Sequence, residues 1–99
     1  MVNNTNPTLS IVIPVYNEQG ALPTVLPEII RFVNEHNYRL ILTNDGSRDN
    51  SLTIMNEICA AERNCKVVHH KVNRGYGGAI KSGVMAAETD YVITIDADG

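Results

Sequence analysis

The stretch Leu9-Ser-Ile-Val-Ile-Pro-Val-Tyr-Asn-Glu18 is an apolar, β-branched run that ends abruptly in polar residues. A short apolar run without polar alternation is typical of a strand that is buried on both faces, as strands of parallel sheets are. Apolar residues then recur at helical spacing and predict a helix over residues 22–36. Pro23 suits the first turn of this helix, whereas Pro27 should delay or bend it because proline lacks an N–H.

The same alternation of apolar patterns continues along the chain. Strands are predicted at residues 39–43, 66–70 and 91–95, and two further helices lie between them. A β-α-β-α-β-α-β order indicates an α/β fold with a Rossmann-like parallel sheet and right-handed crossovers. We expect a flexible leader over residues 1–8 and a single folded unit over residues 9–99. The last strand should leave a bare edge, through which a homodimer could form.

Composition excludes several classes of protein. Hydrophobic residues make up 43% of the 99 residues, which is ordinary for a globular chain, and the net charge of −3 gives no case for binding nucleic acid or an anionic membrane. No segment is long and apolar enough to span a bilayer. Cys59 and Cys65 match no zinc-binding pattern, so we interpret them as free thiols in a reducing compartment and expect a cytoplasmic location.

Polar residues gather where the predicted strands end, which is where open parallel sheets bind ligands. Tyr16 could provide an aromatic platform for a planar base, and Asp45 could accept an N–H from that base. The glycine-rich stretch 73–78 is predicted to be a loop whose backbone N–H groups could face phosphates, with Arg74 or Lys81 adding positive charge. His69 and His70 lack an evident carboxylate partner and are interpreted as structural or surface residues.

Asp96 and Asp98 follow the last predicted strand and form an Asp-x-Asp pair. If the strand continues, residues two apart point to the same side, and two neighbouring carboxylates repel each other. A divalent cation removes that repulsion, and hard oxygen ligands suit Mg²⁺ or Mn²⁺. The sequence therefore predicts a metal site at the end of this strand.

Together these segments resemble the family 2 glycosyltransferases, whose donor-binding half has the GT-A fold. The resemblance rests on four ordered segments and covers residues 9–99: 9–18, Asn44-Asp-Gly-Ser-Arg-Asp49, Asn73-Arg-Gly-Tyr-Gly-Gly-Ala-Ile80 with Gly83, and Asp96-Ala-Asp98. The pattern is most similar to the dolichyl- or polyprenyl-phosphate sugar transferases. One departure is Asn44, which stands where the family usually has Asp.

The resemblance implies that the donor is a nucleotide diphosphate sugar, such as a UDP- or GDP-sugar. The sugar would be transferred with the help of a metal ion, usually with inversion at the anomeric carbon. It implies that the base and ribose would be held by Pro14, Tyr16, Glu18 and Asp45. Asp96 would lie near the ribose or metal, and Asp98 would bind the metal; Arg74, the backbone of Gly75, and Lys81 are the candidate phosphate contacts. The acceptor would be a lipid phosphate or a glycan.

Such enzymes place the acceptor-side catalytic base after the metal motif, so we expect that the 99-residue chain alone transfers no sugar. The full protein would then act in the cytoplasm, at the cytoplasmic face of a membrane. The same fold class allows three alternative functions. A dinucleotide-binding oxidoreductase needs its glycine fingerprint after the first strand, and Ile80 stands where the third glycine would be. A nucleotidyltransferase also needs a phosphate loop there. A non-catalytic nucleotide-sugar-binding module remains open.

Overall fold

The computed structural model describes residues 7–97. Four strands alternate with three helices in the order β1 (Leu9–Val15), α1 (Leu22–His36), β2 (Arg39–Asp45), α2 (Ser51–Ala60), β3 (Cys65–His70), α3 (Gly75–Ala86) and β4 (Tyr91–Thr94). This confirms the predicted alternation and the helix over residues 22–36. The leader expected over residues 1–8 falls largely outside the described residues.

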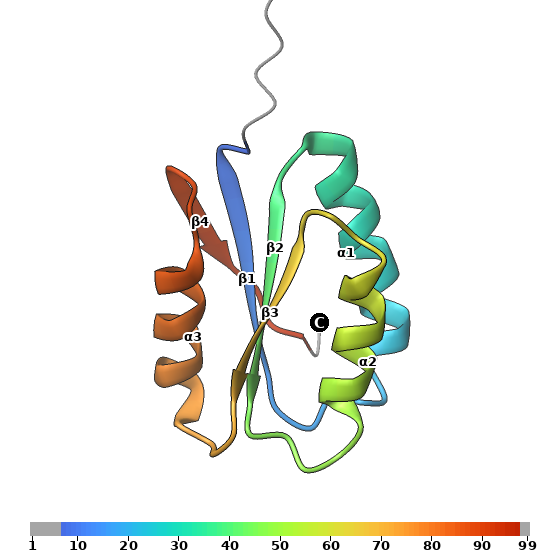
Figure 1. The fold of residues 1–99 in the computed structure, drawn as a ribbon, viewed down its shortest axis with the longest axis vertical. Coiled ribbons are helices and arrows are strands. Elements are labelled where there is room, and N and C mark those ends of the chain that lie inside the picture. Colours follow the sequence, from blue (N-terminus) through green and yellow to red (C-terminus); the bar gives the residue numbers. More distant parts are fainter. Residues whose placement is uncertain (1–6, 98–99) are drawn as a thin grey trace, which may run out of the picture.

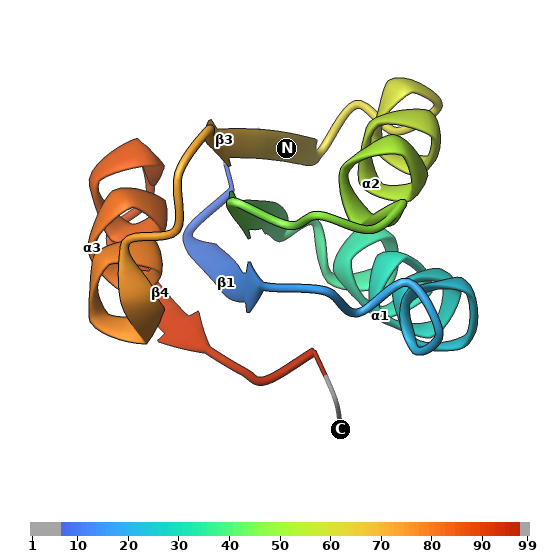
Figure 2. The same ribbon diagram turned by 90° about the horizontal axis from the view of Figure 1, so that it is seen from below.

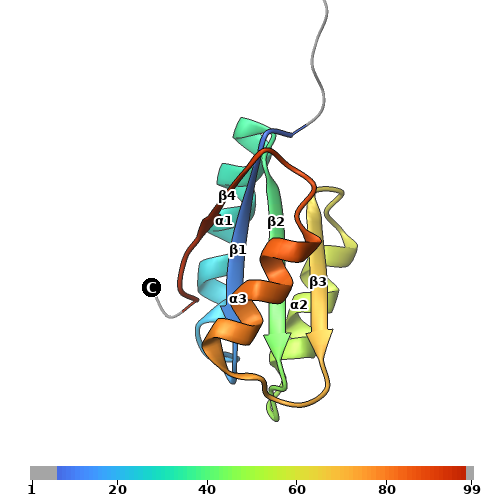
Figure 3. The same cartoon turned by 90° about the vertical axis from the view of Figure 1, so that its left-hand side faces the viewer.

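The four strands form one parallel sheet in the order β3-β2-β1-β4. Helices α1 and α2 cover one face of this sheet and α3 covers the other (Figures 1 and 2). Figure 3 shows α3 lying across the middle of the sheet, with β3 and β4 at the two edges. The expected α/β fold with a Rossmann-like parallel sheet is therefore confirmed, and its helices and sheet form three layers.

Strand β1 is central and is buried from both sides, which explains its unbroken apolar sequence. Ile11, Ile13 and Val15 belong to the cluster beneath α1 and α2. Val12 points to the other face, where a Cβ on Gly83 of α3 would overlap its side chain. Gly83 thus lets α3 approach the sheet closely, and burial of each large side chain in these layers contributes about 1.5–3 kcal/mol.

Pro27 lies inside α1 rather than ending it. Its missing N–H would have bonded the carbonyl of Pro23, and both prolines lie on the exposed side of the helix, where water can solvate that carbonyl. The helix ends at Asn37, which adopts the left-handed conformation with φ of 54°. The expected late start is therefore wrong, because the helix begins at Leu22, and a bend at Pro27 stays a prediction.

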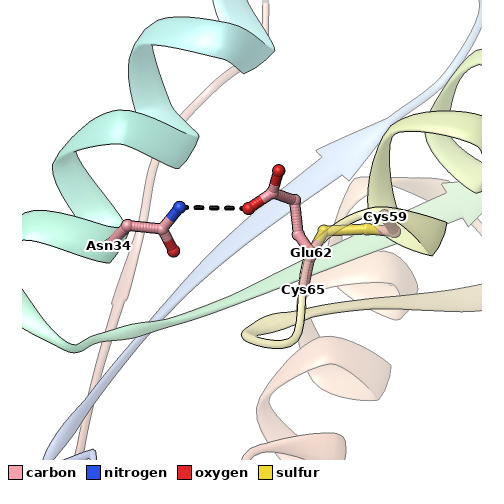
Figure 4. The surroundings of a disulfide bond; sticks show 4 residues. All are labelled: Asn34, Cys59, Glu62 and Cys65. Atoms are coloured by element: carbon pink, nitrogen blue, oxygen red, sulfur yellow. Dashed lines mark hydrogen bonds between the residues drawn. A yellow bond between two sulfur atoms is a disulfide. The ribbon is translucent and has the colours of Figure 1, made fainter.

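Two sequence interpretations need correction. The glycine-rich stretch is a loop only up to Arg74, because α3 begins at Gly75 and the following glycines form its first turn. The two cysteines are not free thiols. Cys59 near the end of α2 and Cys65 at the start of β3 form a disulfide, because the chain turns back between them and brings their Cα atoms to 5.1 Å (Figure 4).

Strand β4 leaves an apolar edge exposed, as the sequence suggested. Tyr91, Ile93 and Ile95 are 70%, 45% and 36% exposed. Tyr91 and Ile93 are in register with Leu9 and Ile11. Their side chains therefore lie on the same face of the sheet as α1. Within residues 7–97, no helix combines the length and apolar character needed to cross a membrane.

Candidate functional site

A cavity of about 420 Å³ lies at the carboxyl ends of the strands. Figure 2 views the molecule from this end, where α3 lies on one side of the sheet and the loops that lead from β1 and β2 into α1 and α2 lie on the other. Six of the proposed binding residues line the cavity: Pro14, Tyr16, Glu18, Asp45, Gly75 and Asp96. The volume falls within the range of about 300–1,000 Å³ that is typical of small-molecule sites.

The loop after β1 is held against the loop after β2 by hydrogen bonds in both directions. Ser51 Oγ accepts the backbone N–H of Glu18 at 2.8 Å, and Asn17 Oδ1 accepts the backbone N–H of Arg48 at 2.8 Å. Three more bonds join the same loops: Asn17 N to Ser47 Oγ, Gln19 N to Asp49 Oδ2, and Asn50 N to Gln19 Oε1. This network fixes Tyr16 and Glu18 beside the end of β2.

Asp49 is the acidic end of the Asp-Gly-Ser-x-Asp element and has a structural role. Its Oδ1 accepts the N–H of Ser51 at 2.9 Å, at the start of α2, and its Oδ2 accepts the N–H of Gln19. Burial acts to raise the pKa of Asp49, but the hydrogen bonds from Ser51 and Gln19 outweigh it and hold the pKa below 3.8. The ionised carboxylate therefore joins the two loops.

Asp45 is the last residue of β2 and is only 3% exposed. Its Oδ1 accepts the backbone N–H of Arg74 at 2.8 Å and lies 3.0 Å from Nδ1 of His70. Burial acts to raise the pKa of Asp45, but the bonds from Arg74 and His70, the charge of His70 and the N–H of Gly75 hold that pKa below 3.8. Asp45 therefore presents an ionised acceptor to the cavity at neutral pH.

The side chain of Asn73, the first residue of the segment 73–80, joins the end of β2 to the start of α3. Its Nδ2 donates to the backbone carbonyl of Asp45 at 3.1 Å, and its Oδ1 accepts the N–H of Gly75 at 3.0 Å. Gly46, with φ of +72°, packs so closely on this segment that an added Cβ would overlap the backbone of Asn73. The end of β2 and the start of α3 are thus locked together.

Asn44 faces away from the cavity, toward the side of the sheet that α1 and α2 cover. It is fully buried, and its Nδ2 lies 3.0 Å from Nδ1 of His69. Its Oδ1 has no hydrogen-bond partner, and Asn44 is not a lining residue. The replacement of the usual Asp by Asn44 therefore removes a charge from a buried position outside the cavity.

The first turn of α3 reaches the cavity through Gly75 and Tyr76. The amino-terminal end of a helix carries partial positive charge and unpaired N–H groups, which favours anions nearby. Arg74 and Lys81 have exposed side chains and do not line the cavity. Their expected direct contacts with phosphate remain predictions, and the recorded contribution of Arg74 is the N–H that it donates to Asp45.

Asp96 lies after β4 and meets Tyr76 across the cavity rim. Tyr76 Oη donates to Asp96 Oδ1 at 3.2 Å, and the hydrogen bond and charge of Asp96 raise the pKa of Tyr76 above 10.0. Asp98 lies outside the described residues. Among residues 7–97, no three His, Cys, Asp or Glu side chains are grouped closely enough to hold a metal ion. Asp96 alone offers one hard oxygen ligand, which suits a cation that takes other ligands from phosphates and water.

Four lining residues were not proposed as binding residues, namely Val15, Asn73, Tyr76 and Ala97, and neither was His70, which bonds Asp45. Tyr76 belongs to the quoted glycine-rich segment, but its position at the rim follows from the start of α3 at Gly75. The interpretation of His70 as lacking a carboxylate partner is wrong, because Asp45 is that partner. The available signal was that Asp45 and His70 lie at the ends of two neighbouring strands. The structure pairs these two residues directly in register.

Comparison with curated proteins identifies relatives of known activity. The chain is 35% identical over 112 residues to dolichyl-phosphate beta-glucosyltransferase of Dictyostelium discoideum, covering 100% of this chain and 34% of that protein. It is 46% identical over 94 residues to undecaprenyl-phosphate 4-deoxy-4-formamido-L-arabinose transferase of Pseudomonas fluorescens SBW25, covering 91% of this chain and 27% of that protein. The chain thus spans about a third or less of the length of these relatives.

Solved structures share the fold. The mannosyltransferase PcManGT of Pyrobaculum calidifontis, in complex with GDP-Man and Mn²⁺, matches with a TM-score of 0.81 at 18% identity over 93% of this chain and 28% of that one. TarS 1–349 of S. aureus, in complex with UDP, matches with a TM-score of 0.80 at 24% identity over 92% and 27%. The model of glycosyl transferase family 2 matches residues 10–99. The chain therefore belongs to glycosyl transferase family 2.

Proposed function

We propose that the cavity binds the nucleotide diphosphate part of a nucleotide-sugar donor, for a glycosyltransferase that transfers the sugar to an acceptor such as a polyprenyl phosphate. The observation that carries this proposal is the convergence of Tyr16, Glu18, Asp45 and Asp96 on one cavity beside the start of α3. An aromatic ring, a buried anionic acceptor and a helix amino terminus are complementary to a base, its N–H and a diphosphate, respectively.

The binding residues predicted from the sequence have separate roles in this proposal. Tyr16, which is 45% exposed, offers its ring to the base, and Asp45 accepts an N–H from the base edge. Glu18 accepts a ribose hydroxyl, and the first turn of α3 faces the diphosphate. Pro14 contributes an apolar wall.

A divalent cation such as Mg²⁺ or Mn²⁺ would be held by Asp96 and Asp98, with the diphosphate supplying further oxygen ligands. The fit rests on the position of Asp96 at the rim, where its carboxylate lines the cavity and already accepts a hydrogen bond from Tyr76. The ion would neutralise charge on the nucleoside diphosphate that leaves when the sugar is transferred. Asp96 would orient this end of the donor, and Tyr76 would hold Asp96.

The acceptor, the location and the assembly are proposals about the whole protein. The names of the relatives include dolichyl and undecaprenyl phosphate, which supports a lipid phosphate acceptor. We propose that the whole protein acts at the cytoplasmic face of a membrane. We propose that the 99-residue chain binds the donor without transferring sugar, because the relatives are about three times longer. A homodimer through the exposed β4 edge remains a prediction, and sedimentation that shows only monomer would contradict it.

Thermal unfolding with added nucleotides tests the donor site. UDP or GDP with Mn²⁺ should raise the melting temperature, whereas NAD should not, because a saturating ligand at a hundred times its Kd stabilises a fold by about 2.7 kcal/mol. Asp98→Ala should abolish the metal-dependent part of this shift. His69→Ala is the matched control, since His69 does not line the cavity. Equal stabilisation without metal and without Asp98 would contradict the metal site.

A further inference from the structure

A hydrogen-bonded series of three side chains, of which Asp45 and His70 are buried and Ser82 is half-buried, runs from the cavity into the packing between the sheet and α3. Oδ1 of Asp45 lies 3.0 Å from Nδ1 of His70, and Nε2 of His70 lies 2.7 Å from Oγ of Ser82. Asp45 and His70 each have side chains that are 4% exposed. Because the three residues come from β2, β3 and α3, this hydrogen-bonded series joins the ends of two neighbouring strands to the helix that covers this face of the sheet.

The contact with Asp45 fixes the tautomer of His70. An ionised carboxylate only accepts hydrogen bonds, so Nδ1 must carry a proton. Nε2 can then accept the hydroxyl proton of Ser82, or donate to Ser82 Oγ when the ring is charged. Ser82 therefore holds the imidazole in place in either charge state, and the orientation of the ring toward Asp45 is kept.

This arrangement determines what Asp45 can offer to a ligand. The N–H of Arg74 and Nδ1 of His70 both bond Oδ1 of Asp45, and the N–H of Gly75 adds a weaker interaction with the same carboxylate. An oxygen with two donors has used its two lone pairs, so Oδ2 is the acceptor that remains for a base. One acceptor oxygen is complementary to a base edge with a single N–H between two carbonyls, as in uracil. The guanine edge, with two adjacent donors, pairs best with both oxygens of a carboxylate.

We propose that His70 is a positioning residue that sets base recognition: by occupying Oδ1 of Asp45 it orients the carboxylate so that Oδ2 meets one N–H donor, which favours a uracil over a guanine nucleotide. This inference rests on the proposed donor site. A Ser-His-Asp hydrolytic triad is the competing explanation of the same geometry. Ser82 does not line the cavity, so no substrate bound there meets its hydroxyl.

Two isosteric variants separate the contacts of His70. His70→Asn keeps an amide N–H near the position of Nδ1 and should retain the bond to Asp45, whereas His70→Gln keeps a group near Nε2 and retains only the contact with Ser82. Calorimetric titration of the full chain with UDP and with GDP, each with Mg²⁺, should give a lower Kd for UDP in the wild type. His70→Asn should keep that Kd within about threefold, and His70→Gln should raise it about tenfold and reduce the UDP preference.

The outcomes distinguish the two proposals. A wild-type chain that binds neither UDP nor GDP overturns the donor site itself. A wild type that binds UDP, with equal Kd values in both variants, overturns the role of His70 alone, as does a wild type that prefers GDP. Long-range ¹H–¹⁵N spectra of wild-type histidines provide a readout that needs no variant to fold. They should show His70 with its proton on Nδ1, and a neutral ring with the proton on Nε2 would contradict the proposal. Hydrolysis of an ester substrate that is lost in Ser82→Ala would instead support the triad.

Discussion

Asn44 and Asp45 are neighbours at the end of β2, and they face opposite sides of the sheet. Asp45 lines the cavity and bonds His70, whereas Asn44 is buried on the other side and contacts His69. This alternation is a property of extended strands, in which successive side chains point in opposite directions. Of the two positions, only Asp45 can therefore contribute directly to recognition in the cavity.

This difference predicts opposite outcomes for two conservative changes. Asp45→Asn should weaken UDP binding by about ten- to a hundredfold, because an amide N–H would replace the acceptor oxygen that faces the base. Asn44→Asp, which introduces the residue that the family resemblance implies, should leave the Kd within about threefold, because position 44 does not line the cavity. Calorimetry on both variants measures this. Comparable losses in the two would show that the cavity does not discriminate between the faces of β2.

Tyr76 should support metal-dependent binding through Asp96. Tyr76→Phe removes the hydroxyl that donates to Asp96 Oδ1 and should weaken UDP binding in Mn²⁺ by about two- to tenfold, the range expected for one exposed hydrogen bond. The melting temperature should hardly change, because Tyr76 is 62% exposed. Tyr91→Phe is the matched control, since Tyr91 is 70% exposed and lies outside the cavity. An unchanged Kd in Tyr76→Phe would remove Tyr76 from the site.

Two glycines of α3 should respond oppositely to alanine. Gly83→Ala places a Cβ against Val12 and Thr43 and should lower the free energy of unfolding by about 1–3 kcal/mol. In Gly77→Ala the added Cβ meets no atom within 4 Å. This change should raise the free energy of unfolding by about 0.5–1 kcal/mol, because alanine is the better helix former. Urea unfolding gives both values. A neutral Gly83→Ala would mean that α3 is not tightly packed on the sheet.

Acid should destabilise the fold through Asp45 and Asp49. Both carboxyls have pKa values below 3.8 in the folded chain, so the unfolded chain binds protons more readily. Their contribution to the free energy of unfolding is fully present above 3.8, the ordinary pKa of the unfolded chain. It is lost as the pH falls below 3.8 toward the lower pKa values of the folded chain. Asp45→Asn should flatten the dependence of unfolding free energy on pH in this range. An unchanged slope in both Asp45→Asn and Asp49→Asn would contradict the assignment.

Reduction of the Cys59–Cys65 disulfide should have a modest effect. The bridge closes a short segment, with a sequence separation of 6, so loop-closure entropy predicts a contribution of about 2 kcal/mol. Mass spectrometry after thiol alkylation should find no free thiol in the oxidised chain and two after reduction. Cys59→Ser should match the reduced protein in melting temperature. Two alkylated thiols without reductant would show that the free-thiol interpretation of the sequence was correct.

The sequence predicted the strands and the cavity rim well, because β-branched runs and polar strand ends are local signals. The start of α3 at Gly75 was missed because glycines near a turn look like a loop, and only the packing of α3 on β1 and β2 stabilises them as helix. The pairing of Asp45 with His70 depends on the register between β2 and β3. The disulfide depends on how tightly the chain turns after α2. These features require the tertiary arrangement.

The most direct test of the account is to map nucleotide binding onto the chain by NMR. Titration of ¹⁵N-labelled protein with UDP in Mg²⁺ should shift the backbone resonances of Tyr16, Glu18, Asp45, Gly75 and Asp96, while those around Phe32 and Tyr38, at the other end of α1, stay constant. Such a pattern would place the nucleotide in the cavity at the carboxyl ends of the strands. Absence of shifts at saturating UDP, or shifts confined to residues outside the cavity, would contradict the proposed donor site.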